Sequence, residues 1–468
     1  MKKKLLLINP WIYDFTAFDL WSQPLGLLYL ASFLRRFEYD IAYIDCLGGN
    51  GHSKTKKYGT GHYPRTIIEK PAILHYVPRH YARYGISEED FIARLQQNHD
   101  ADAILITSIM TYWYPGVQNV VRLVRQHLPD KPVILGGIYA TLLPQHAKRI
   151  IQPDYLVTGP GELKTLQLLS SILQQPYNNE NLPKSLDDYP YPAFDLLERT
   201  EYLLIMTSRG CPYDCSFCAQ KKIAMPYARR SPDGVVREFQ EQYERFRLRD
   251  FAFYDDALFL AKEKHIEIIL QKLISCKLPL RLHSPNGLFA KYIDRRLAEL
   301  MYKSGFKTIR ISFETSNEQR RKDMYSKVTN EAMIQAVQNL VAAGYKAAEL
   351  EAYVLMGLPE QSLEEVIASI IFVNNLGVQV KLASFSPIPG TLEYQRAVEK
   401  GLIPEDIDPL LSNKSIYPLA DPQTSFERFR KVRTFAMVLN ESAKRGLRMF
   451  DDRPFNATIK AVMNELLI

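Results

Sequence analysis

The stretch Cys211-Pro212-Tyr213-Asp214-Cys215-Ser216-Phe217-Cys218 decides the fold and the chemistry expected of this chain. It holds three of the five cysteines with the spacing C-x3-C-x2-C, and it follows an apolar segment that predicts a strand. Three thiolates in so short a loop can each bind one iron of a [4Fe–4S] cluster. The fourth iron then has no protein ligand and is able to bind a small molecule, whereas clusters that only carry electrons usually have four cysteines.

A structural zinc site and a disulfide are the alternatives for these cysteines. Zinc sites use four Cys or His ligands, commonly as two separated pairs, and no histidine lies within thirty residues of the loop. A disulfide framework is disfavoured by the odd number of cysteines and by the lack of a signal peptide. The other two cysteines, Cys46 and Cys276, lie at or near the ends of apolar segments and are expected to be small core residues.

Working outward from the loop, the chain alternates apolar strands with amphipathic helices over residues 201–400. The expected strands are Leu203–Thr207, Asp250–Tyr254, Leu280–Pro285, Thr308–Phe313, Leu350–Met356 and Gln379–Phe385. Six βα units are fewer than the eight of a closed barrel. We therefore expect a partial (β/α)6 barrel, followed by a helical C-terminal region at residues 401–468, which either caps the barrel or completes a substrate pocket.

A second α/β pattern precedes the barrel and occupies residues 1–175. Its expected strands are Lys4–Asn9, Ile41–Asp45, Ala103–Ser108, Val133–Gly137 and Tyr155–Val157. Short apolar strands that alternate with helices predict a Rossmann-like, doubly wound parallel sheet. Ligands of such sheets bind beyond the carboxyl ends of the strands, and glycine and polar residues gather at those ends here. A proline-rich linker at residues 176–200 joins the two domains.

One long insertion, at residues 48–84, interrupts the first pattern. It is rich in Gly, His, Tyr, Lys and Arg, and a loop of this length is usually functional or disordered. Its aromatic residues argue against simple disorder. Three interpretations remain open, namely a lid over a cofactor, a wall of the substrate pocket, or a surface addition.

Composition sets bounds on location and partners. No stretch of eighteen uncharged apolar residues occurs, so no membrane span is expected. The reducing cytoplasm is the expected compartment, because it suits an oxygen-sensitive cluster. The net charge of +7 is modest for 468 residues and is not concentrated in one segment, so a nucleic-acid partner is not expected.

The cysteine run and the barrel pattern resemble the radical S-adenosylmethionine (SAM) superfamily over residues 200–400. The resemblance implies that Cys211, Cys215 and Cys218 hold a [4Fe–4S] cluster whose open iron chelates the amine and carboxylate of SAM. One electron from the cluster then cleaves SAM to methionine and a 5′-deoxyadenosyl radical, which abstracts a hydrogen from a substrate. The resemblance also implies an external electron donor such as flavodoxin or ferredoxin. The protein's own part is to exclude water and direct the radical.

The resemblance further implies where SAM contacts lie, namely at the carboxyl ends of the barrel strands. The positions that match are Phe217, Asp255, Asp256, Asn286, Ser312, Glu314 and Gly357. Phe217 matches the aromatic position that packs on the adenine. The pair Asp255 and Asp256 stands where the family often has a Gly-Gly-Glu turn, and this departure puts their contact with the SAM ammonium in doubt.

A Rossmann-like domain before such a barrel resembles the cobalamin-binding subfamily. The residues expected to contact cobalamin are Thr107, Ser108, Gly136, Gly137, Thr141, Gly159 and Glu162. Small residues would let the corrin and its nucleotide tail lie against the backbone, and hydroxyls would bond to its amides. The chain lacks the Asp-x-His-x-x-Gly motif that supplies a histidine to cobalt. The aromatic residues at positions 112–114 either cover the lower face of cobalamin, where such a histidine would bind, or belong to an interdomain core.

The sequence therefore predicts a radical SAM enzyme, with cobalamin as a further cofactor and methylation of an unreactive carbon as the reaction. The substrate, a small molecule or a peptide, is not identified by the sequence. One alternative is a different radical reaction, such as a rearrangement, a cyclisation or methylthiolation, although methylthiolation would require more cysteines in the first domain. Another alternative is an iron–sulfur or corrinoid sensor, but no output module is visible.

Overall fold

The computed structural model describes residues 2–49, 51–325, 328–419 and 422–447, together with residues 459, 461, 462, 464 and 465. The chain divides into two compact units. The first comprises residues 1–204, 219–230 and 408–412, and the second comprises residues 205–218, 231–407 and 413–468. Among the helices described, none has the length and hydropathy needed to cross a bilayer.

The first unit is built on a parallel five-stranded sheet in the order β11-β10-β9-β1-β4. The strands are β1 (Lys4–Asn9), β4 (Asp40–Asp45), β9 (Ala103–Ile106), β10 (Val133–Leu135) and β11 (Tyr155–Leu156). The predicted doubly wound sheet is confirmed. The chain moves from β1 to β4 on one side and then returns to β9 on the other, so the topological switch point lies between β1 and β9.

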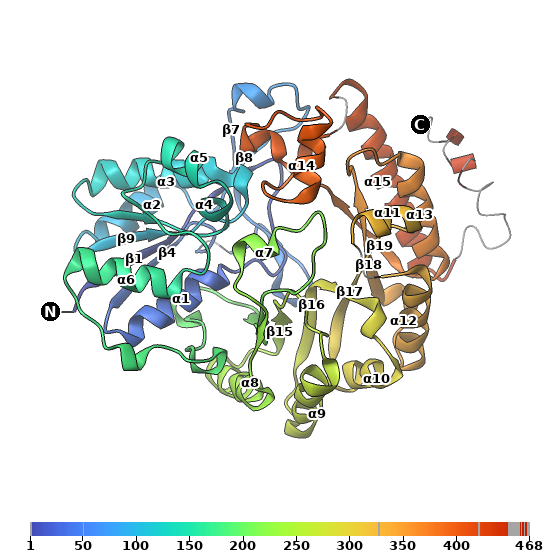
Figure 1. Ribbon diagram of the computed structural model, residues 1–468, viewed down its shortest axis with the longest axis horizontal. Helices are drawn as coiled ribbons and strands as arrows, with labels where there is room; N and C mark the ends of the chain where they lie inside the picture. Colours follow the sequence, from blue (N-terminus) through green and yellow to red (C-terminus); the bar gives the residue numbers. More distant parts are fainter. Residues whose placement is uncertain are drawn as a thin grey trace. The chain divides into compact units, whose positions relative to one another are not determined.

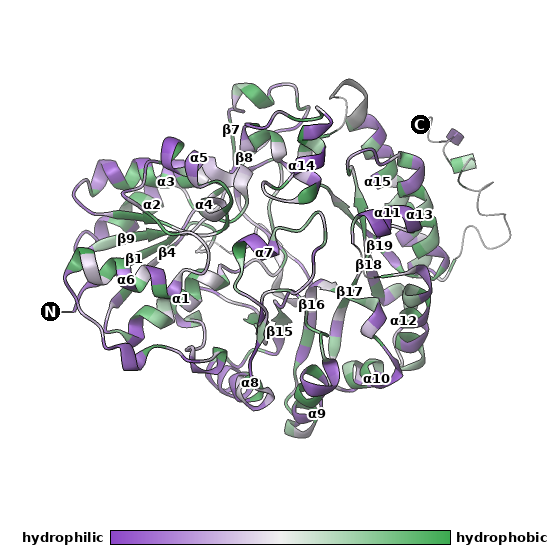
Figure 2. Ribbon diagram, in the orientation of Figure 1, coloured by the Kyte–Doolittle hydropathy of each residue, from purple (hydrophilic) through white to green (hydrophobic). Residues whose placement is uncertain are grey.

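Both faces of the central strands are buried, which is why β1, β9 and β10 are mostly apolar. Alternate side chains of β1 belong to two separate buried clusters. Helices α1 (Leu25–Arg36) and α6 (Glu162–Leu173) pack in one cluster, and α2 (Glu88–Gln97) and α3 (Tyr114–His127) pack in the other (Figure 1). Figure 2 shows the matching distribution of hydropathy, with hydrophobic strands inside and helices that are hydrophilic on their outer faces.

The insertion at residues 48–84 is not the irregular loop that the sequence suggests. It forms short strands that pair with residues 12–19 in two antiparallel sheets, β2-β8-β7 and β3-β6-β5. The strands are β2 (Ile12–Asp14), β3 (Phe18–Asp19), β5 (Lys54–Thr55), β6 (Gly61–His62), β7 (Arg65–Ile68) and β8 (Tyr81–Tyr84). Strands of two to four residues are too short to show an alternating pattern, and for this reason the sequence does not reveal them.

The second unit is built on a six-stranded sheet whose order, β12-β15-β16-β17-β18-β19, follows the chain. The strands are β12 (Leu203–Ile205), β15 (Asp250–Phe253), β16 (Arg281–Leu288), β17 (Phe306–Glu314), β18 (Leu350–Met356) and β19 (Gln379–Ser384). Strands β15 to β19 pair in parallel. Within the described residues β12 and β19 are the two ends of the sheet and do not pair, so the predicted partial barrel is confirmed.

The loops that lead into most of the barrel helices supply a side-chain cap for the helix. The helices are α8 (Pro232–Phe246), α9 (Ile266–Cys276), α10 (Arg295–Lys303), α12 (Asn330–Ala342), α13 (Leu363–Asn375) and α14 (Leu392–Glu399). Five of them begin after a side chain that accepts a hydrogen bond from the first helical turn, namely Ser231, Asp294, Thr329, Ser362 and Thr391. Such caps satisfy backbone donors that a helix leaves unpaired at its start.

Helix α15 (Pro422–Lys444) bonds to the last strand of the barrel sheet, and the two roles expected of the C-terminal region stay predictions. Its Asn440 side chain accepts a hydrogen bond from the Val380 amide at 2.7 Å and donates one to the Val380 carbonyl at 2.9 Å. These bonds cover the free edge of β19, an edge that would otherwise be open to pairing with another strand. Most of the expected helical tail beyond residue 447 lies outside the described residues.

Candidate functional site

The cysteine loop begins directly after β12 and is fastened at its middle. Gly210, just before the first cysteine, has a φ of +78°, in a region that favours glycine. The Ser216 amide donates to the Met324 carbonyl at 3.1 Å, and the Ser216 carbonyl accepts from the Glu393 amide at 3.0 Å. The Ser216 hydroxyl donates to the Glu393 carboxylate at 2.6 Å. The loop that carries the cysteines is therefore held by residues far along the chain.

Phe217 packs in a buried cluster that includes Leu355 and Leu358. These two residues flank Gly357 at the carboxyl end of β18, where Gly357 has a φ of +89°. The structure thus brings the two positions expected to contact the adenine, Phe217 and Gly357, into one neighbourhood. Their contact with SAM stays a prediction.

The three thiols are free of disulfides and differ in exposure, since Cys211 and Cys215 are half-buried and Cys218 is exposed. Burial, the Tyr292 hydroxyl and the neighbouring Cys211 and Cys215 together raise the pKa of Tyr213, which lies within the loop. No group of three or more His, Cys, Asp or Glu side chains in the described residues converges on a single metal ion. Thiolates that bind three different irons of a cluster need not converge on one point, so this donor set fits a cubane.

The Asp255 side chain is buried and accepts hydrogen bonds from other residues of the protein, so it does not face the solvent. It is 4% exposed, and its Oδ1 accepts hydrogen bonds from the Thr207 hydroxyl at 2.7 Å and the Ser208 hydroxyl at 2.6 Å. Both carboxylate oxygens lie 3.1 Å from the Thr207 amide. Burial raises the pKa of Asp255, and these hydrogen bonds oppose the rise. This arrangement favours a structural role for Asp255, and the half-buried Asp256 beside it stays a predicted SAM ligand.

The carboxyl ends of β15, β16 and β17 meet directly. The Asn286 side-chain amide donates to the Asp255 carbonyl at 3.3 Å. Gly287 lies so close to β17 that a Cβ built on it would be 1.7 Å from the Ser312 hydroxyl oxygen. Asp255, Asn286 and Ser312, which were expected at one edge of the barrel, are therefore neighbours.

Glu314 ends β17 in a strained conformation. Its φ is +71°, a region that side-chain-bearing residues rarely adopt. The pairing of β17 with β18 also shifts register between Ser312 and Glu314. Strained residues of this kind cluster at functional sites, and this supports the predicted contact of Glu314 with SAM.

A charged hydrogen-bond network around Arg310 supports the carboxyl ends of these strands, and it was not predicted from the sequence. Arg310 donates to the Glu351 carboxylate at 2.8 Å and to the Tyr353 hydroxyl at 3.2 Å. The Tyr353 hydroxyl donates in turn to the Pro285 carbonyl at 2.8 Å, just before Asn286. The available signal was the alternation of polar and apolar residues along β17, which places Arg310 on the same face as the predicted site residues.

In the first unit, the residues expected to contact cobalamin form one bonded group at the carboxyl ends of β9, β10 and β11. The Ser108 hydroxyl donates to the Gly136 carbonyl at 2.6 Å. The Thr141 hydroxyl donates to the Gly137 carbonyl at 2.8 Å and accepts from the Gly159 amide at 2.9 Å. The two hydroxyls therefore shape the backbone here, and their expected bonds to the tail or side amides of cobalamin stay a prediction.

Several glycines at this edge of the sheet have open space beside their backbone. A Cβ built on Gly136, Gly159 or Gly161 would meet no heavy atom closer than 3.5 Å. Thr107 follows β9 and is half-buried, and Glu162 opens α6 at the same edge. A surface of small residues beside polar groups fits the tail of cobalamin, and the individual contacts stay predictions.

The aromatic residues after β9 have partners within the first unit. The Trp113 indole donates to the Asp14 carboxylate at 2.7 Å. Tyr112 is 2% exposed, and the Tyr114 ring stacks on Tyr139 with 6.1 Å between centroids. These contacts support a packing role, and coverage of the corrin by these residues stays a prediction.

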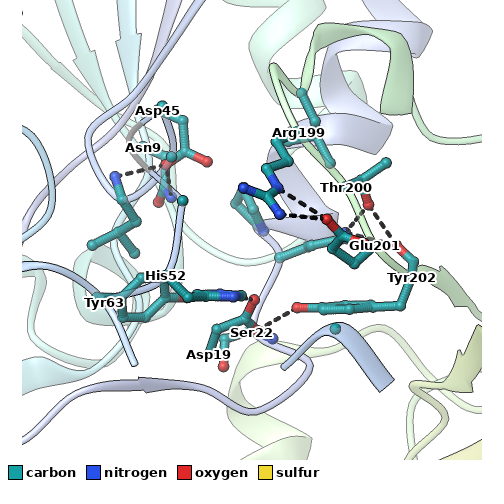
Figure 3. Close-up of a pocket in the computed structure, with 18 residues that line it drawn as sticks. Asn9, Asp19, Ser22, Asp45, His52, Tyr63, Arg199, Thr200, Glu201 and Tyr202 are labelled. Atoms are coloured by element: carbon teal, nitrogen blue, oxygen red, sulfur yellow. Dashed lines mark hydrogen bonds and ion pairs between the residues drawn. The ribbon is translucent and has the colours of Figure 1, made fainter. Parts of the chain in front are cut away.

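The first unit also contains a polar cavity of about 80 Å³ (Figure 3). The insertion provides one of its walls through Gly48, Gly49, Gly51, His52, Gly59 and Tyr63. Asp19 lies 3.0 Å from the His52 ring nitrogen and also accepts hydrogen bonds from the Tyr202 hydroxyl and the Ser22 amide. The polar groups in this cavity therefore bind mainly to one another and hold the insertion to residues 199–202.

Comparison with known families agrees with the two sites. Residues 205–373 match the model of the radical SAM superfamily, and residues 78–169 match that of the B12-binding domain. The chain therefore contains a radical SAM domain and a B12-binding domain. The three cysteines, the strand ends described above and the edge of the first sheet all fall within or beside the matched residues. The matches imply a [4Fe–4S] cluster, SAM and cobalamin as the cofactors of this radical SAM enzyme, as expected.

Individual relatives extend this similarity to most of the radical SAM chain. An uncharacterized methyltransferase of Pyrococcus horikoshii is 24% identical over 87% of this chain and 84% of its own. Cytidylyl-2-hydroxyethylphosphonate methyltransferase of Streptomyces wedmorensis is 22% identical over 86% of this chain and 83% of its own. The radical SAM methyltransferase TsrM of Kitasatospora setae, solved with cobalamin and a [4Fe–4S] cluster, has a TM-score of 0.63 at 16% identity, covering 86% of this chain and 78% of TsrM.

Replacing Gly287 by alanine is expected to weaken SAM binding at least about tenfold, because the new methyl group would have to displace Ser312. Isothermal titration of the reconstituted protein with SAM measures the effect. Gly26→Ala is the matched control, since a Cβ built there meets no atom within 4 Å. An unchanged SAM affinity in a folded Gly287→Ala protein would contradict the placement of SAM beside Ser312.

Proposed function

We propose that this radical SAM enzyme uses cobalamin to methylate an unreactive carbon of its substrate. The observation that carries the proposal is the fastened three-cysteine loop after β12, in a chain whose residues 78–169 match the B12-binding domain. The methyltransferase names of the two curated relatives support methylation as the outcome. The substrate is a small molecule or a peptide.

Each part of the site has a proposed task. Cys211, Cys215 and Cys218 hold the cluster, and the edge formed by Asn286, Ser312 and Glu314 orients SAM. Phe217 and Gly357 provide the apolar place for an adenine ring. Bound together, the cluster and SAM supply one-electron carbon-radical chemistry, and cobalamin supplies methyl transfer.

We propose that electrons reach the cluster from an external donor such as flavodoxin or ferredoxin. A chain with three cluster-type cysteines has no second set of thiols from which to build its own electron relay, since Cys46 is 0% exposed and Cys276 lies on α9. Reduced flavodoxin is expected to replace dithionite in supporting SAM cleavage. Failure of reduced flavodoxin and ferredoxin alike, with dithionite effective, would contradict this choice of donor.

Anaerobic purification with cobalamin supplied is expected to give about four iron and four sulfide ions and about one cobalt per chain. With SAM and dithionite this protein should release 5′-deoxyadenosine, and with its methyl acceptor it should also release S-adenosylhomocysteine. Metal analysis and chromatography measure these quantities. A full cluster without cobalt would contradict the use of cobalamin, and a loaded protein that releases no 5′-deoxyadenosine would favour a sensor.

A further inference from the structure

Asp255 occupies a position from which it touches both halves of the proposed site. It follows β15 and is 4% exposed, while its partners Thr207 and Ser208 are 0% and 1% exposed. A buried carboxylate is tolerated only where hydrogen bonds replace its water. The hydrogen-bond donors around the Asp255 carboxylate therefore indicate its structural role.

The side chain of Asp255 holds the start of the cysteine loop. It accepts from the Thr207 amide and hydroxyl and from the Ser208 hydroxyl, at 2.6 to 3.1 Å. Ser208 stands only three residues before Cys211. Hydrogen bonds to a charged acceptor are stronger than those between neutral groups, so this carboxylate fixes the backbone from which the loop departs.

A histidine fixes the same hydroxyl from the other side. His265 is 1% exposed, and its Nε2 lies 3.0 Å from the Thr207 hydroxyl. The Thr207 hydroxyl already donates to Asp255, so it accepts from His265, and this requires the proton on Nε2. Thr207 is thus oriented by two buried partners from outside the cysteine loop, Asp255 and His265.

The main chain of Asp255 reaches the other half of the site. Its carbonyl accepts from the Asn286 side chain at 3.3 Å, and the adjacent Gly287 packs against Ser312. A continuous series of contacts therefore runs from the start of the cysteine loop through Asp255 to the edge proposed for SAM.

We propose that Asp255 is a positioning residue that sets the cysteine loop and the Asn286 turn against each other, so that a cluster and SAM meet in a fixed geometry. This inference rests on the proposed function. It assigns to Asp255 a task different from the contact with the SAM ammonium that the sequence suggested, and it leaves that contact to Asp256.

The test compares matched variants in two forms of the protein. Asp255→Asn keeps the shape but offers one acceptor oxygen and an unwanted donor, and Thr207→Val removes the hydroxyl at nearly constant volume. Asp256→Asn and Thr207→Ser are the controls, because the first leaves the Asp255 carboxylate intact and the second keeps the hydroxyl. Thermal unfolding of each variant checks that it is folded.

In metal-free protein, alkylation of Cys211 and Cys215 by iodoacetamide, followed by mass spectrometry, reports how well the loop is held. Asp255→Asn and Thr207→Val are expected to label these cysteines about tenfold faster than the wild type, as the loss of bonds to a charged group implies. The controls should label them at the wild-type rate. Cys276, which lies elsewhere on α9, is the internal reference and should not change.

In reconstituted protein, Asp255→Asn and Thr207→Val are expected to weaken SAM binding about tenfold and to reduce the change that SAM causes in the electron paramagnetic resonance spectrum of the reduced cluster. Asp256→Asn should weaken SAM binding without faster thiol labelling. Wild-type labelling rates in Asp255→Asn, or equal behaviour of Thr207→Val and Thr207→Ser, would overturn the inference. A wild-type protein that assembles no cluster would refute the proposed function, and the labelling experiment would still decide the role of Asp255.

Discussion

Cys215→Ala is expected to abolish cluster assembly and to lower SAM cleavage at least about a thousandfold, while the protein stays folded. Each of the three thiolates is expected to hold one iron, and the other two cysteines of the chain, Cys46 and Cys276, lie outside the loop. Removal of the cluster removes the electron that cleaves SAM. The fold should survive, because Cys215 is half-buried and the neighbouring Ser216 provides the anchoring bonds.

Iron and sulfide analysis, 5′-deoxyadenosine release and thermal unfolding together measure this effect. Cys276→Ala is the matched control, since Cys276 is also half-buried and its thiol is contacted by the Gln240 side chain at 3.3 Å on the outer helices. This control should keep both its cluster and its turnover. A Cys215→Ala protein with a full complement of iron and normal turnover would refute the assignment of the loop.

Gly137→Ala is expected to lower the free energy of unfolding by more than about 2 kcal/mol and to remove cobalamin binding. Gly137 caps α4 (Ile138–Leu142) with φ and ψ of 94° and −168°, a conformation restricted to glycine. A Cβ built there would lie 2.2 Å from the Ser108 carbonyl oxygen and 2.6 Å from the Ser108 nitrogen. Backbone atoms cannot move aside as a flexible side chain does, so the ends of β9 and β10 would have to separate.

Urea unfolding and titration with cobalamin, followed by absorbance, measure the two parts of this prediction. Gly136→Ala is an unusually close control, because its Cβ would meet only the Val157 carbonyl oxygen at 3.7 Å. Its stability should stay within about 0.5 kcal/mol of the wild type. Equal behaviour of the two variants would show that this edge is not built as the contacts indicate. Normal cobalamin binding by Gly137→Ala would place the cofactor elsewhere.

Much of the fold can be predicted from the sequence because most of its sheet strands have apolar cores and are separated by helices. Strands β1 and β18 have the predicted bounds, since each carries a nearly continuous apolar signal. The strands of the insertion could not be predicted, because two-residue strands have no period and because β6 pairs with β3, some forty positions earlier in the chain. Their pairing depends on tertiary contacts, which a local sequence pattern does not encode.

The candidate site, like the fold, could be predicted from the sequence only in part. The three cysteines and the strand-end positions could be named because spacing and topology place them. The actual partners of Asp255 could not, since Thr207 lies 48 residues earlier and nothing local distinguishes a carboxylate that binds the chain from one that binds a ligand. The same holds for the main-chain hydrogen bonds of the Ser108 and Thr141 hydroxyls, whose expected contact with cobalamin stays a prediction.

The bonds of Ser216 to Glu393 also order events in the life of the polypeptide. The two residues are 177 positions apart, so a ribosome must synthesise almost the whole second unit before the cysteine loop acquires its shape. The machinery that delivers iron and sulfide therefore meets its finished acceptor only late in translation or after release. A nascent chain truncated before residue 393 would present the same three thiols on an unfastened loop.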